Sequence, residues 1–235
     1  MEDKLNVLSN QNIFITGGNR GIGLGLLKGL SVSNNVIFSV RDKDKGEKTL
    51  EEIKNLHADY VVMDVDDTNS IEVAVGELKN KLSKVDILFN NAGILLKEYD
   101  VDAVDTPETS ILKTFNTNTL GVLRVCRSVI PLMKNGGRII NVSSGMGQLE
   151  DMESGSIAYR LSKTALNALS KVMSNELSSR NIKVNVICPG WVQTDMGGSS
   201  ANLTVEESTD RIIKFALEDS FPNGKFLQHG EIIPW

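Results

Sequence analysis

The sequence predicts an α/β fold, a single doubly wound domain with a mostly parallel sheet of about seven strands and helices on both faces. Three observations predict it. Short apolar runs rich in Val and Ile alternate with stretches of helical periodicity, and helices placed between strands make those strands parallel. A glycine-rich turn follows the first apolar run. No repeat or Pro/Gly/Ser linker divides the 235 residues, a length that suits one domain.

The apolar runs mark the expected strands, and the amphipathic stretches between them mark the expected helices. The strands are expected at residues 12–18, 35–40, 59–65, 85–93, 137–144 and 182–190, with a last strand near 225–233. The helices are expected at residues 20–30, 43–56, 70–82, 108–133, 156–180 and 204–218. Ligands of such sheets bind beyond the carboxyl ends of the strands, so the loops at those ends are the candidates for function.

Composition and charge exclude some classes of partner. A formal net charge of −5 argues against a nucleic-acid or anionic-membrane surface, since both need concentrated Lys and Arg. The first ten residues are not a secretory signal, and no apolar run is long enough to span a bilayer. Cys126 and Cys188 have no metal-binding spacing, so we expect buried free thiols, no metal site and a cytoplasmic location.

The stretch "TGGNRGIG" at residues 16–23 stands between the first expected strand and the first expected helix. Gly17 allows a tight turn, Gly21 lets a phosphate approach the backbone, and Gly23 lets the helix pack close to the sheet. The helix N-terminus adds free N–H groups for a pyrophosphate. Such loops also occur as simple turns, but the strand before and the helix after favour the dinucleotide site of a Rossmann domain.

The end of the second expected strand, "SVRD" at residues 39–42, bears on which dinucleotide binds. An NAD site puts a carboxylate there for the ribose 2′-hydroxyl, but Val40 occupies this position and Arg41 follows. Arg41 and Arg20 suit a 2′-phosphate through charge-assisted hydrogen bonds, so the sequence favours NADPH over NADH. Two alternatives stay open: the arginines are merely solvated, or Asp42 is the ribose carboxylate.

Tyr159 and Lys163 stand four positions apart in the expected helix 156–180, so their side chains share one face. A nearby ammonium lowers the pKa of a phenol, which suits general acid–base catalysis. At the end of the preceding strand, Ser143 or Ser144 could donate a hydrogen bond to a substrate carbonyl oxygen, and only one of them points into the site. Alone, such a pair is common by chance and such serines cap loops. Beside a dinucleotide site they indicate catalysis.

Six stretches together resemble the short-chain dehydrogenase/reductase family along nearly the whole chain. They are "TGGNRGIG" (16–23), "NNAG" (90–93), "NTLG" (118–121), "NVSSGMG" (141–147), "YRLSK" (159–163) and "PGWVQT" (189–194). The C-terminal stretches "PGWVQTDMGGSSANLTVEES" and "GKFLQHGEIIPW" resemble the narrower group of Sniffer-type carbonyl reductases and C-factor. The chain departs from the family in lacking its frequent glycine-rich terminal strand.

The resemblance implies a role for each matching residue. Tyr159 would donate the proton in reduction and accept it in oxidation, and Lys163 would hold the nicotinamide ribose and tune Tyr159. Ser144, the second serine of the pair, would polarise the carbonyl, and Asn118 would hold a water in the proton relay. The implied cofactor-binding residues are Gly17, Asn19, Arg20, Gly21, Ile22, Gly23, Arg41, Asp64, Val65, Asn91, Ala92, Gly93, Tyr159, Lys163, Pro189, Gly190, Val192 and Thr194.

The expected substrate site lies between the loops 94–107, 145–158 and 196–204, the last of which is a Gly- and Ser-rich candidate lid. The stretch from Ser144 to Tyr159 is slightly longer than the commonest family spacing, and the extra residues fall in the acidic loop 148–156. This loop is either solvated or one wall of the substrate entrance.

The expected function is reversible, NADPH-dependent reduction of a ketone or aldehyde to an alcohol. The alternatives are an NAD(P)-binding signalling or sensor protein of the C-factor type with little turnover, and an NAD-dependent alcohol oxidation. The expected partner is a small carbonyl or alcohol substrate, with no nucleic acid and no membrane. The resemblance also implies a homodimer or homotetramer formed through the helices 108–133 and 156–180.

Overall fold

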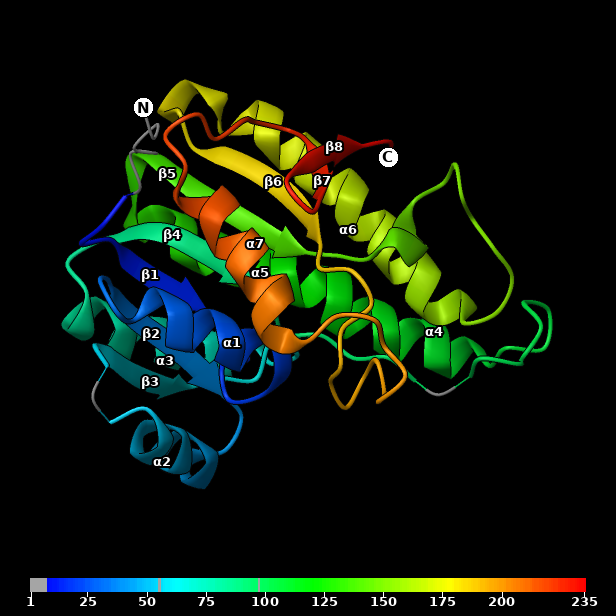
Figure 1. Ribbon diagram of the computed structural model, residues 1–235, viewed down its shortest axis with the longest axis horizontal. Coiled ribbons are helices and arrows are strands. Elements are labelled where there is room, and N and C mark those ends of the chain that lie inside the picture. The colour runs from blue at the N-terminus through cyan, green and yellow to red at the C-terminus, as the bar shows by residue number, and fades with distance from the viewer. Residues whose placement is uncertain (1–7, 55, 97) are drawn as a thin grey trace.

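The computed structural model describes residues 8–54, 56–96 and 98–235. Position 55 of the expected helix 43–56, position 97 of the expected loop 94–107 and the first seven residues lie outside these ranges. Within them, eight strands form one sheet in the order β3-β2-β1-β4-β5-β6-β7-β8 (Figure 1). All neighbouring strands are parallel except β7 and β8. This is the doubly wound, Rossmann-like fold that the sequence predicts.

The strands and helices follow the predicted order. The strands are β1 (Asn12–Ile15), β2 (Asn35–Val40), β3 (Ala58–Val62), β4 (Val85–Asn90), β5 (Met133–Val142), β6 (Lys183–Cys188), β7 (Phe226–Gln228) and β8 (Glu231–Ile233). The helices are α1 (Gly21–Leu30), α2 (Lys43–Glu52), α3 (Thr68–Lys81), α4 (Glu108–Phe115), α5 (Val122–Val129), α6 (Ile157–Glu176) and α7 (Val205–Leu217).

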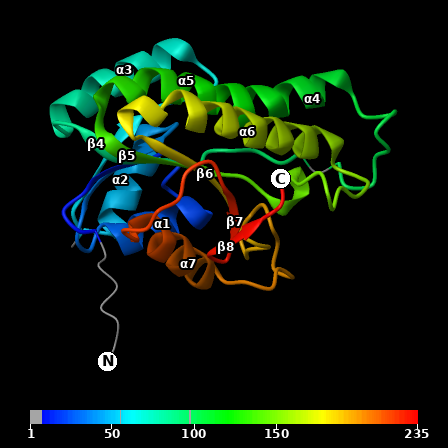
Figure 2. The ribbon, with the colours of Figure 1, turned by 90° about the horizontal axis from the view of Figure 1, so that it is seen from above.

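The helices cover both faces of the sheet, and each face has its own apolar core. One core packs α3, α5 and α6 against the sheet around side chains such as Leu88 and Leu166. The other packs α1 and α7 against the opposite face around Leu27 and Phe215. Figure 2 shows the two layers, with α1 and α7 below the strands and α3, α5 and α6 above them. Burial on both faces explains why the strands are continuous apolar runs rather than alternating ones.

The end of the chain differs from the prediction. The single strand expected near 225–233 is a hairpin, β7 and β8, which adds an antiparallel edge and makes eight strands within the described residues. Its two-residue turn has His229 at φ 54° and Gly230 at φ 87°. A tight hairpin turn needs two positive φ values and usually has Asn, Asp or Gly at its first position. Because this turn has a histidine there, the sequence indicates the hairpin only weakly.

The expected helix 108–133 forms as one continuous run, but its middle is not α-helical. Residues Asn116–Gly121 make a π-helical segment between α4 and α5. Such π-helical insertions are frequent at functional sites. This one carries Asn118, whose side chain is fully buried.

Two further expectations concern cysteines and membranes. Cys126 and Cys188 are free and buried, as predicted. Across the ranges that the structure describes, every helix is too short or too polar to cross a membrane.

The start of α7 offers a test of local stability. The hydroxyl of Thr204 accepts a hydrogen bond from the N–H of Glu207 at 3.1 Å, and the Glu207 carboxylate accepts one from the N–H of Thr204 at 2.8 Å. This capping box predicts that Thr204→Ala loses about 1 kcal/mol of unfolding free energy, a drop in Tm of about 2–4 °C in a scanning melt. Ser199→Ala, at an exposed position nearby, is the control. A Thr204→Ala melt equal to that control would contradict the cap.

Candidate active site

The glycine-rich loop between β1 and α1 is tightly constrained. Gly17 and Gly21 have φ values of 69° and 51°, a region that favours glycine. A Cβ on Gly23 would lie 2.1 Å from the carbonyl oxygen of Gly17. The side-chain amide of Asn91 donates to that same oxygen at 3.0 Å, and the N–H of Gly17 donates to the Ser39 hydroxyl at 3.1 Å. The loop is therefore clamped between the ends of β2 and β4.

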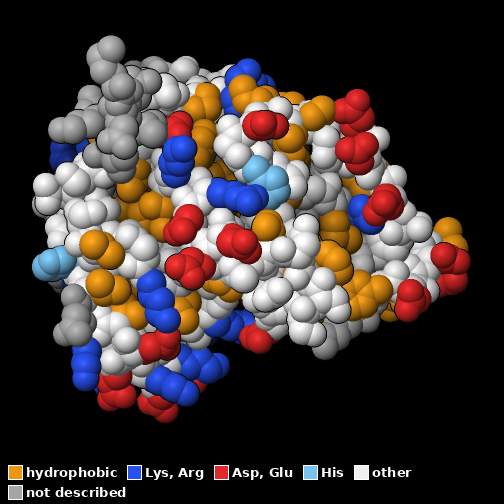
Figure 3. Space-filling model, viewed as in Figure 1, with side chains coloured by type: hydrophobic (Ala, Val, Ile, Leu, Met, Phe, Trp, Pro, Cys, Tyr) orange, Lys and Arg blue, Asp and Glu red, His pale blue; other side chains and the backbone are white. Residues whose placement is uncertain are grey.

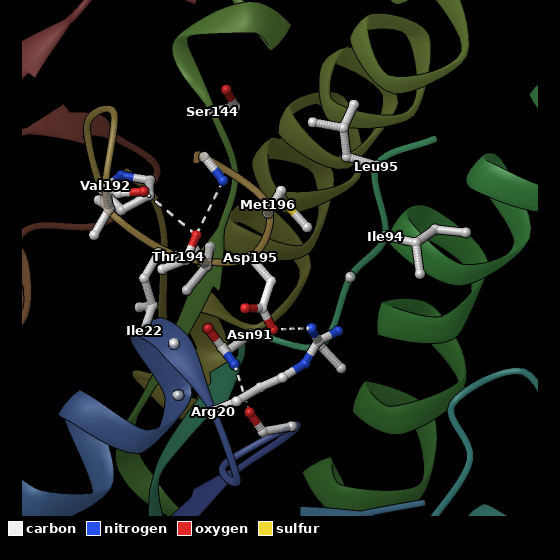
Figure 4. Close-up of a pocket in the computed structure, with 18 of the residues that line it drawn as sticks. Arg20, Ile22, Asn91, Ile94, Leu95, Ser144, Val192, Thr194, Asp195 and Met196 are labelled. Atoms are coloured by element: carbon white, nitrogen blue, oxygen red, sulfur yellow. Dashed lines mark hydrogen bonds and ion pairs between the residues drawn. The ribbon is translucent and has the colours of Figure 1, made fainter. Parts of the chain in front are cut away.

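A cavity of about 660 Å³ runs along the carboxyl ends of the strands. Every residue that the resemblance assigns to the cofactor lines it, from the glycine-rich loop through Arg41, Asp64 and Asn91 to Thr194. Ser144, Tyr159 and Lys163 line it as well. Figure 4 shows part of this wall, with Ile22, Asn91 and Val192 on one side and Ile94 and Leu95 on the other.

Sequence reasoning missed several residues of the wall. It did not single out Met146, Trp191 or Asp195, which all line the cavity. The last two share one loop with the predicted Val192 and Thr194, so the continuity of that loop was the available signal. The cavity residues from the loops 94–107 and 196–204 are Ile94, Leu95, Tyr99, Met196, Gly197, Gly198 and Ser200.

Tyr159 and Lys163 are held side by side near the start of α6. Both side chains are buried, and the Lys163 ammonium lies 5.6 Å from the centre of the Tyr159 ring. The Nζ of Lys163 donates to the carbonyl oxygen of Val142, at the end of β5, at 2.8 Å. The Sδ of Met196 stands 4.0 Å from the phenol oxygen of Tyr159. The pair therefore lies between the sheet edge and the loop after β6.

Burial shifts the pKa values of the two groups in opposite directions. It raises the pKa of the Tyr159 phenol, while the Ser144 side chain acts to lower it. It lowers the pKa of Lys163 to about 8, while the neighbouring Cys188 side chain acts to raise it. We expected Lys163 to lower the phenol pKa. In this structure the pKa of the phenol is raised instead, because burial penalises its charged form, and the phenol stays protonated.

The geometry separates the two candidate serines. The Ser143 hydroxyl donates to the Asn167 side-chain oxygen at 2.7 Å and is buried against α6. The Ser144 oxygen accepts the N–H of Met146 at 3.1 Å, which leaves its O–H free to donate a hydrogen bond. Figure 4 shows the Ser144 side chain among the residues that line the cavity. Ser144 therefore has the hydroxyl that is not already bonded to α6, and the carbonyl-polarising role that the resemblance implies for it stays a prediction.

Asn118 does not line the cavity but lies behind it. Its side-chain oxygen accepts the N–H of Ile94 at 2.8 Å, and its amide donates to the Ile94 carbonyl at 2.9 Å and to the Ser162 hydroxyl at 3.0 Å. These contacts hold the segment after β4 against α6. The polar atoms of the Asn118 side chain therefore all bond to protein groups beside the cavity. The water-holding role that the resemblance implies for Asn118 stays a prediction.

The residues expected at the adenosine ribose have different surroundings. Arg41 is exposed at the cavity wall. Asp42 caps α2, accepting the N–H of Asp44 at 3.0 Å, and lies outside the cavity lining, which disfavours it as the ribose carboxylate. Arg20 lines the cavity, and its Nη1 pairs at 2.7 Å with the carboxylate of Asp195.

The acidic loop 148–156 folds away from the cavity. The Arg160 side chain is buried and donates to the carbonyl oxygens of Gly155 at 3.0 Å and Ser154 at 3.1 Å, and it lies 3.4 Å from Glu153. Of the expected loop 145–158, Met146 alone lines the cavity, so the solvated alternative fits loop 148–156. Acidic side chains gather at this end of the molecule in Figure 3. In the part of the chain that the structure describes, no group of His, Cys, Asp or Glu could hold a metal ion.

Comparison with known proteins places the chain in a family. The family model described as short chain dehydrogenase matches residues 11–203. The chain therefore belongs to the short-chain dehydrogenase family, which confirms the resemblance noted in the sequence.

Similar proteins within the family include several carbonyl reductases. Human carbonyl reductase (NADPH) 1 is 29% identical over 272 residues, covering 94% of this chain and 97% of its own. Short-chain dehydrogenase anuI of Penicillium roqueforti (strain FM164) is 31% identical, covering 88% of this chain and 89% of its own. Two solved structures, carbonyl reductase Sniffer of D. melanogaster and an NADPH-bound carbonyl reductase from chicken fatty liver, superpose with TM-scores of 0.89 at 30% and 29% identity. Both cover 97% of this chain and all of their own.

The clamp in the glycine-rich loop predicts a sharp contrast between two glycines in helices. Gly23→Ala would set a methyl group against the Gly17 backbone, so we expect it to lose about 1–3 kcal/mol of unfolding free energy. Gly76→Ala in α3 meets nothing within 4 Å and should gain up to about 1 kcal/mol from helix propensity. Urea unfolding measures both. A Gly23→Ala variant as stable as the parent would refute the clamp.

Proposed function

We propose that this chain catalyses the reversible, NADPH-dependent reduction of a ketone or aldehyde to an alcohol. The observation that carries the proposal is the buried Tyr159 phenol at the wall of a cavity of about 660 Å³, which Ser144 and Lys163 line as well; burial raises the pKa of this phenol and so keeps it protonated. A protonated acid next to a hydrogen-bond donor is what a developing alkoxide needs.

The residues present fit a dinucleotide. The cavity begins at the N-terminus of α1, where glycines let a phosphate reach free N–H groups. Arg41 stands exposed at the end of β2, and Asp42 is occupied as a cap, an arrangement that suits a 2′-phosphate better than a ribose 2′-hydroxyl. The carbonyl reductases similar to this chain are named for NADPH, and one solved relative has NADPH bound, which supports NADPH as the preferred cofactor.

The side chains divide the chemistry between them. NADPH, when bound, supplies the hydride. Ser144 donates a hydrogen bond to the carbonyl oxygen, and Tyr159 donates the proton to that oxygen as charge develops on it. Lys163, fixed by the carbonyl of Val142, binds ribose hydroxyls and stabilises the phenolate that remains on Tyr159.

The rest of the cavity favours a substrate with an apolar group. Its apolar lining residues include Ile94, Leu95, Met146, Trp191 and Met196, and Met196 touches the Tyr159 phenol. Apolar walls with a few directed polar groups are typical of small-molecule sites. We infer a ketone or aldehyde with an aliphatic or aromatic substituent.

We also propose that the chain works as one cytoplasmic domain that pairs into a homodimer or homotetramer. The helical run 108–132 and α6 expose large apolar side chains, among them Leu112, Leu161 and Val172. Such exposed residues are suited to a contact between copies of the chain.

A substitution of the acid tests the function. We expect Tyr159→Phe to lose at least about a hundredfold in kcat, since general acid catalysis contributes about 10²–10⁴-fold, while NADPH affinity stays within about twofold. The assay is NADPH oxidation over a panel of apolar ketones and aldehydes, with binding measured by calorimetry.

The other outcomes identify the rival functions. NADPH binding without turnover in the parent protein would favour a sensor, and turnover of the corresponding alcohols with NAD⁺ that exceeds carbonyl reduction with NADPH would favour the alcohol-oxidising alternative. If Tyr159→Phe turned over as fast as the parent protein, Tyr159 would not be the general acid.

The pKa of Lys163 predicts a basic limb in the pH profile. Above its pKa of about 8 the ammonium is lost, whereas the Tyr159 pKa is raised and its phenol stays protonated. We expect kcat/KM for reduction to be level below pH 8 and to fall toward tenfold per pH unit above it. Lys163→Arg keeps its charge above pH 8, so its kcat/KM should not fall there, even if the variant is slower than the parent at every pH.

Unfolding would not explain such a limb. The folded-state pKa of Lys163 is lower than its ordinary value of 10.5, so the folded protein binds fewer protons at this group and its stability rises as pH increases through this range. Melts recorded at each pH provide the control. A kcat/KM that stays level to pH 9.5 would contradict the role of Lys163.

A further inference from the structure

The segment 191–200, which follows β6 and is called the flap below, holds its own shape. The indole N–H of Trp191 donates to the carbonyl of Gly197 at 2.8 Å, and the N–H of Gly198 donates to the carbonyl of Thr194, also at 2.8 Å. At its base, the N–H of Leu203 donates to the carbonyl of Trp191 at 3.1 Å. Gly190, with φ 83°, precedes it. The internal bonds make the flap a unit that can shift without unfolding.

The tip of the flap stands where a substrate carbonyl must sit. A carbonyl oxygen that takes a proton from Tyr159 has to come within about 2.6–3.2 Å of the phenol oxygen. The Sδ of Met196 already lies 4.0 Å from that oxygen. A carbonyl group that approaches the phenol oxygen from this side therefore has to displace the Met196 side chain.

One ion pair joins the flap to the glycine-rich loop. Asp195, next to Met196, accepts from the Nη1 of Arg20 at 2.7 Å, and both side chains line the cavity. Figure 4 shows the Arg20 guanidinium extended toward the Asp195 carboxylate. The contact links the N-terminal cap of α1 to a residue 175 positions away.

This ion pair is weak enough for a phosphate to displace. The side chains of Arg20 and Asp195 are 61% and 78% exposed, and exposed pairs contribute little because water screens them. A phosphate group offers the guanidinium more charge and a bidentate geometry. Once a phosphate lies in the cavity, it also repels the Asp195 carboxylate.

We propose that Asp195 is a positioning residue that holds Arg20 away from the cofactor phosphates and holds Met196 over Tyr159. A dinucleotide phosphate that takes Arg20 frees Asp195, and the flap then uncovers the phenol for the carbonyl substrate. This inference rests on the proposed function. It assigns Asp195 the role of a competitor with the cofactor phosphates for Arg20.

The first test measures cofactor binding by calorimetry. Asp195→Asn removes the competitor for Arg20, so we expect NADP⁺ to bind about two- to fivefold more tightly, the range that an exposed pair supports. Asp210→Asn, an equal change of charge at an exposed position of α7, is the matched control and should leave the Kd unchanged. An unchanged or weaker Kd in Asp195→Asn, or an equal gain in the control, overturns the proposal.

NAD⁺ shows which phosphate operates the flap. A gain in Asp195→Asn seen with NADP⁺ but not with NAD⁺ assigns Arg20 to the 2′-phosphate, and a gain with both assigns it to the diphosphate. Either result supports the proposal, since Arg20 is taken by a phosphate in both.

The second test follows the flap itself. The chain has two tryptophans, so Trp235→Phe leaves Trp191 of the flap as the single reporter, with Trp235→Tyr as the substitute if that variant is unstable. NADP⁺, which does not absorb indole emission, should change the Trp191 spectrum. Asp195→Asn in this background should already show the shifted spectrum without cofactor. A Trp191 spectrum that responds to neither change overturns the proposal.

The two proposals fail differently. If the parent protein binds neither NADP⁺ nor NAD⁺, the proposed function and the flap inference both fall. If it binds NADP⁺ and reduces carbonyls while Asp195→Asn behaves like the parent, the inference about the flap alone falls.

Discussion

The close approach of Gly23 to the carbonyl oxygen of Gly17 is the constraint on which the site depends. A carbon at position 23 would stand 2.1 Å from that oxygen, so the first turn of α1 can reach the loop only because it carries no side chain there. The same oxygen accepts the Asn91 amide at 3.0 Å. The helix N-terminus and the ends of β1 and β4 are thereby brought to one cavity, where their N–H groups and dipole act together.

The second half of the site is positioned by polar contacts with α6. Lys163 reaches the carbonyl of Val142, and Ser162 accepts a hydrogen bond from the buried Asn118. Buried polar contacts fix one arrangement more strictly than apolar packing does, because an unpaired partner is costly. The π-helical segment around Asn118 therefore has a structural consequence: it holds the wall at Ile94 and the helix of Tyr159 in a single relation to each other.

The sequence predicted what is encoded locally. The order of strands and helices, the glycine-rich loop and the Tyr159–Lys163 spacing all follow from short-range patterns. The Arg20–Asp195 pair joins residues 175 positions apart, and neither neighbourhood indicates the other. The hairpin at His229 was read as one strand, because a non-glycine residue at positive φ leaves little trace in a sequence. A contact between exposed charged residues that lie far apart in the sequence can thus not be predicted from short-range patterns.

Burial shifts the pKa values of the two neighbouring groups of the site in opposite senses, and this bears on the protonation state of the pair before any ligand binds. It raises the pKa of Tyr159 and lowers that of Lys163 to about 8. A phenol that stays protonated is ready as an acid, whereas oxidation would need the phenolate. The ammonium that would stabilise this phenolate is itself weakened by the same burial. The pKa values of the pair therefore depend on how deeply it is covered, and Met196 is part of that cover for as long as the flap stays over Tyr159.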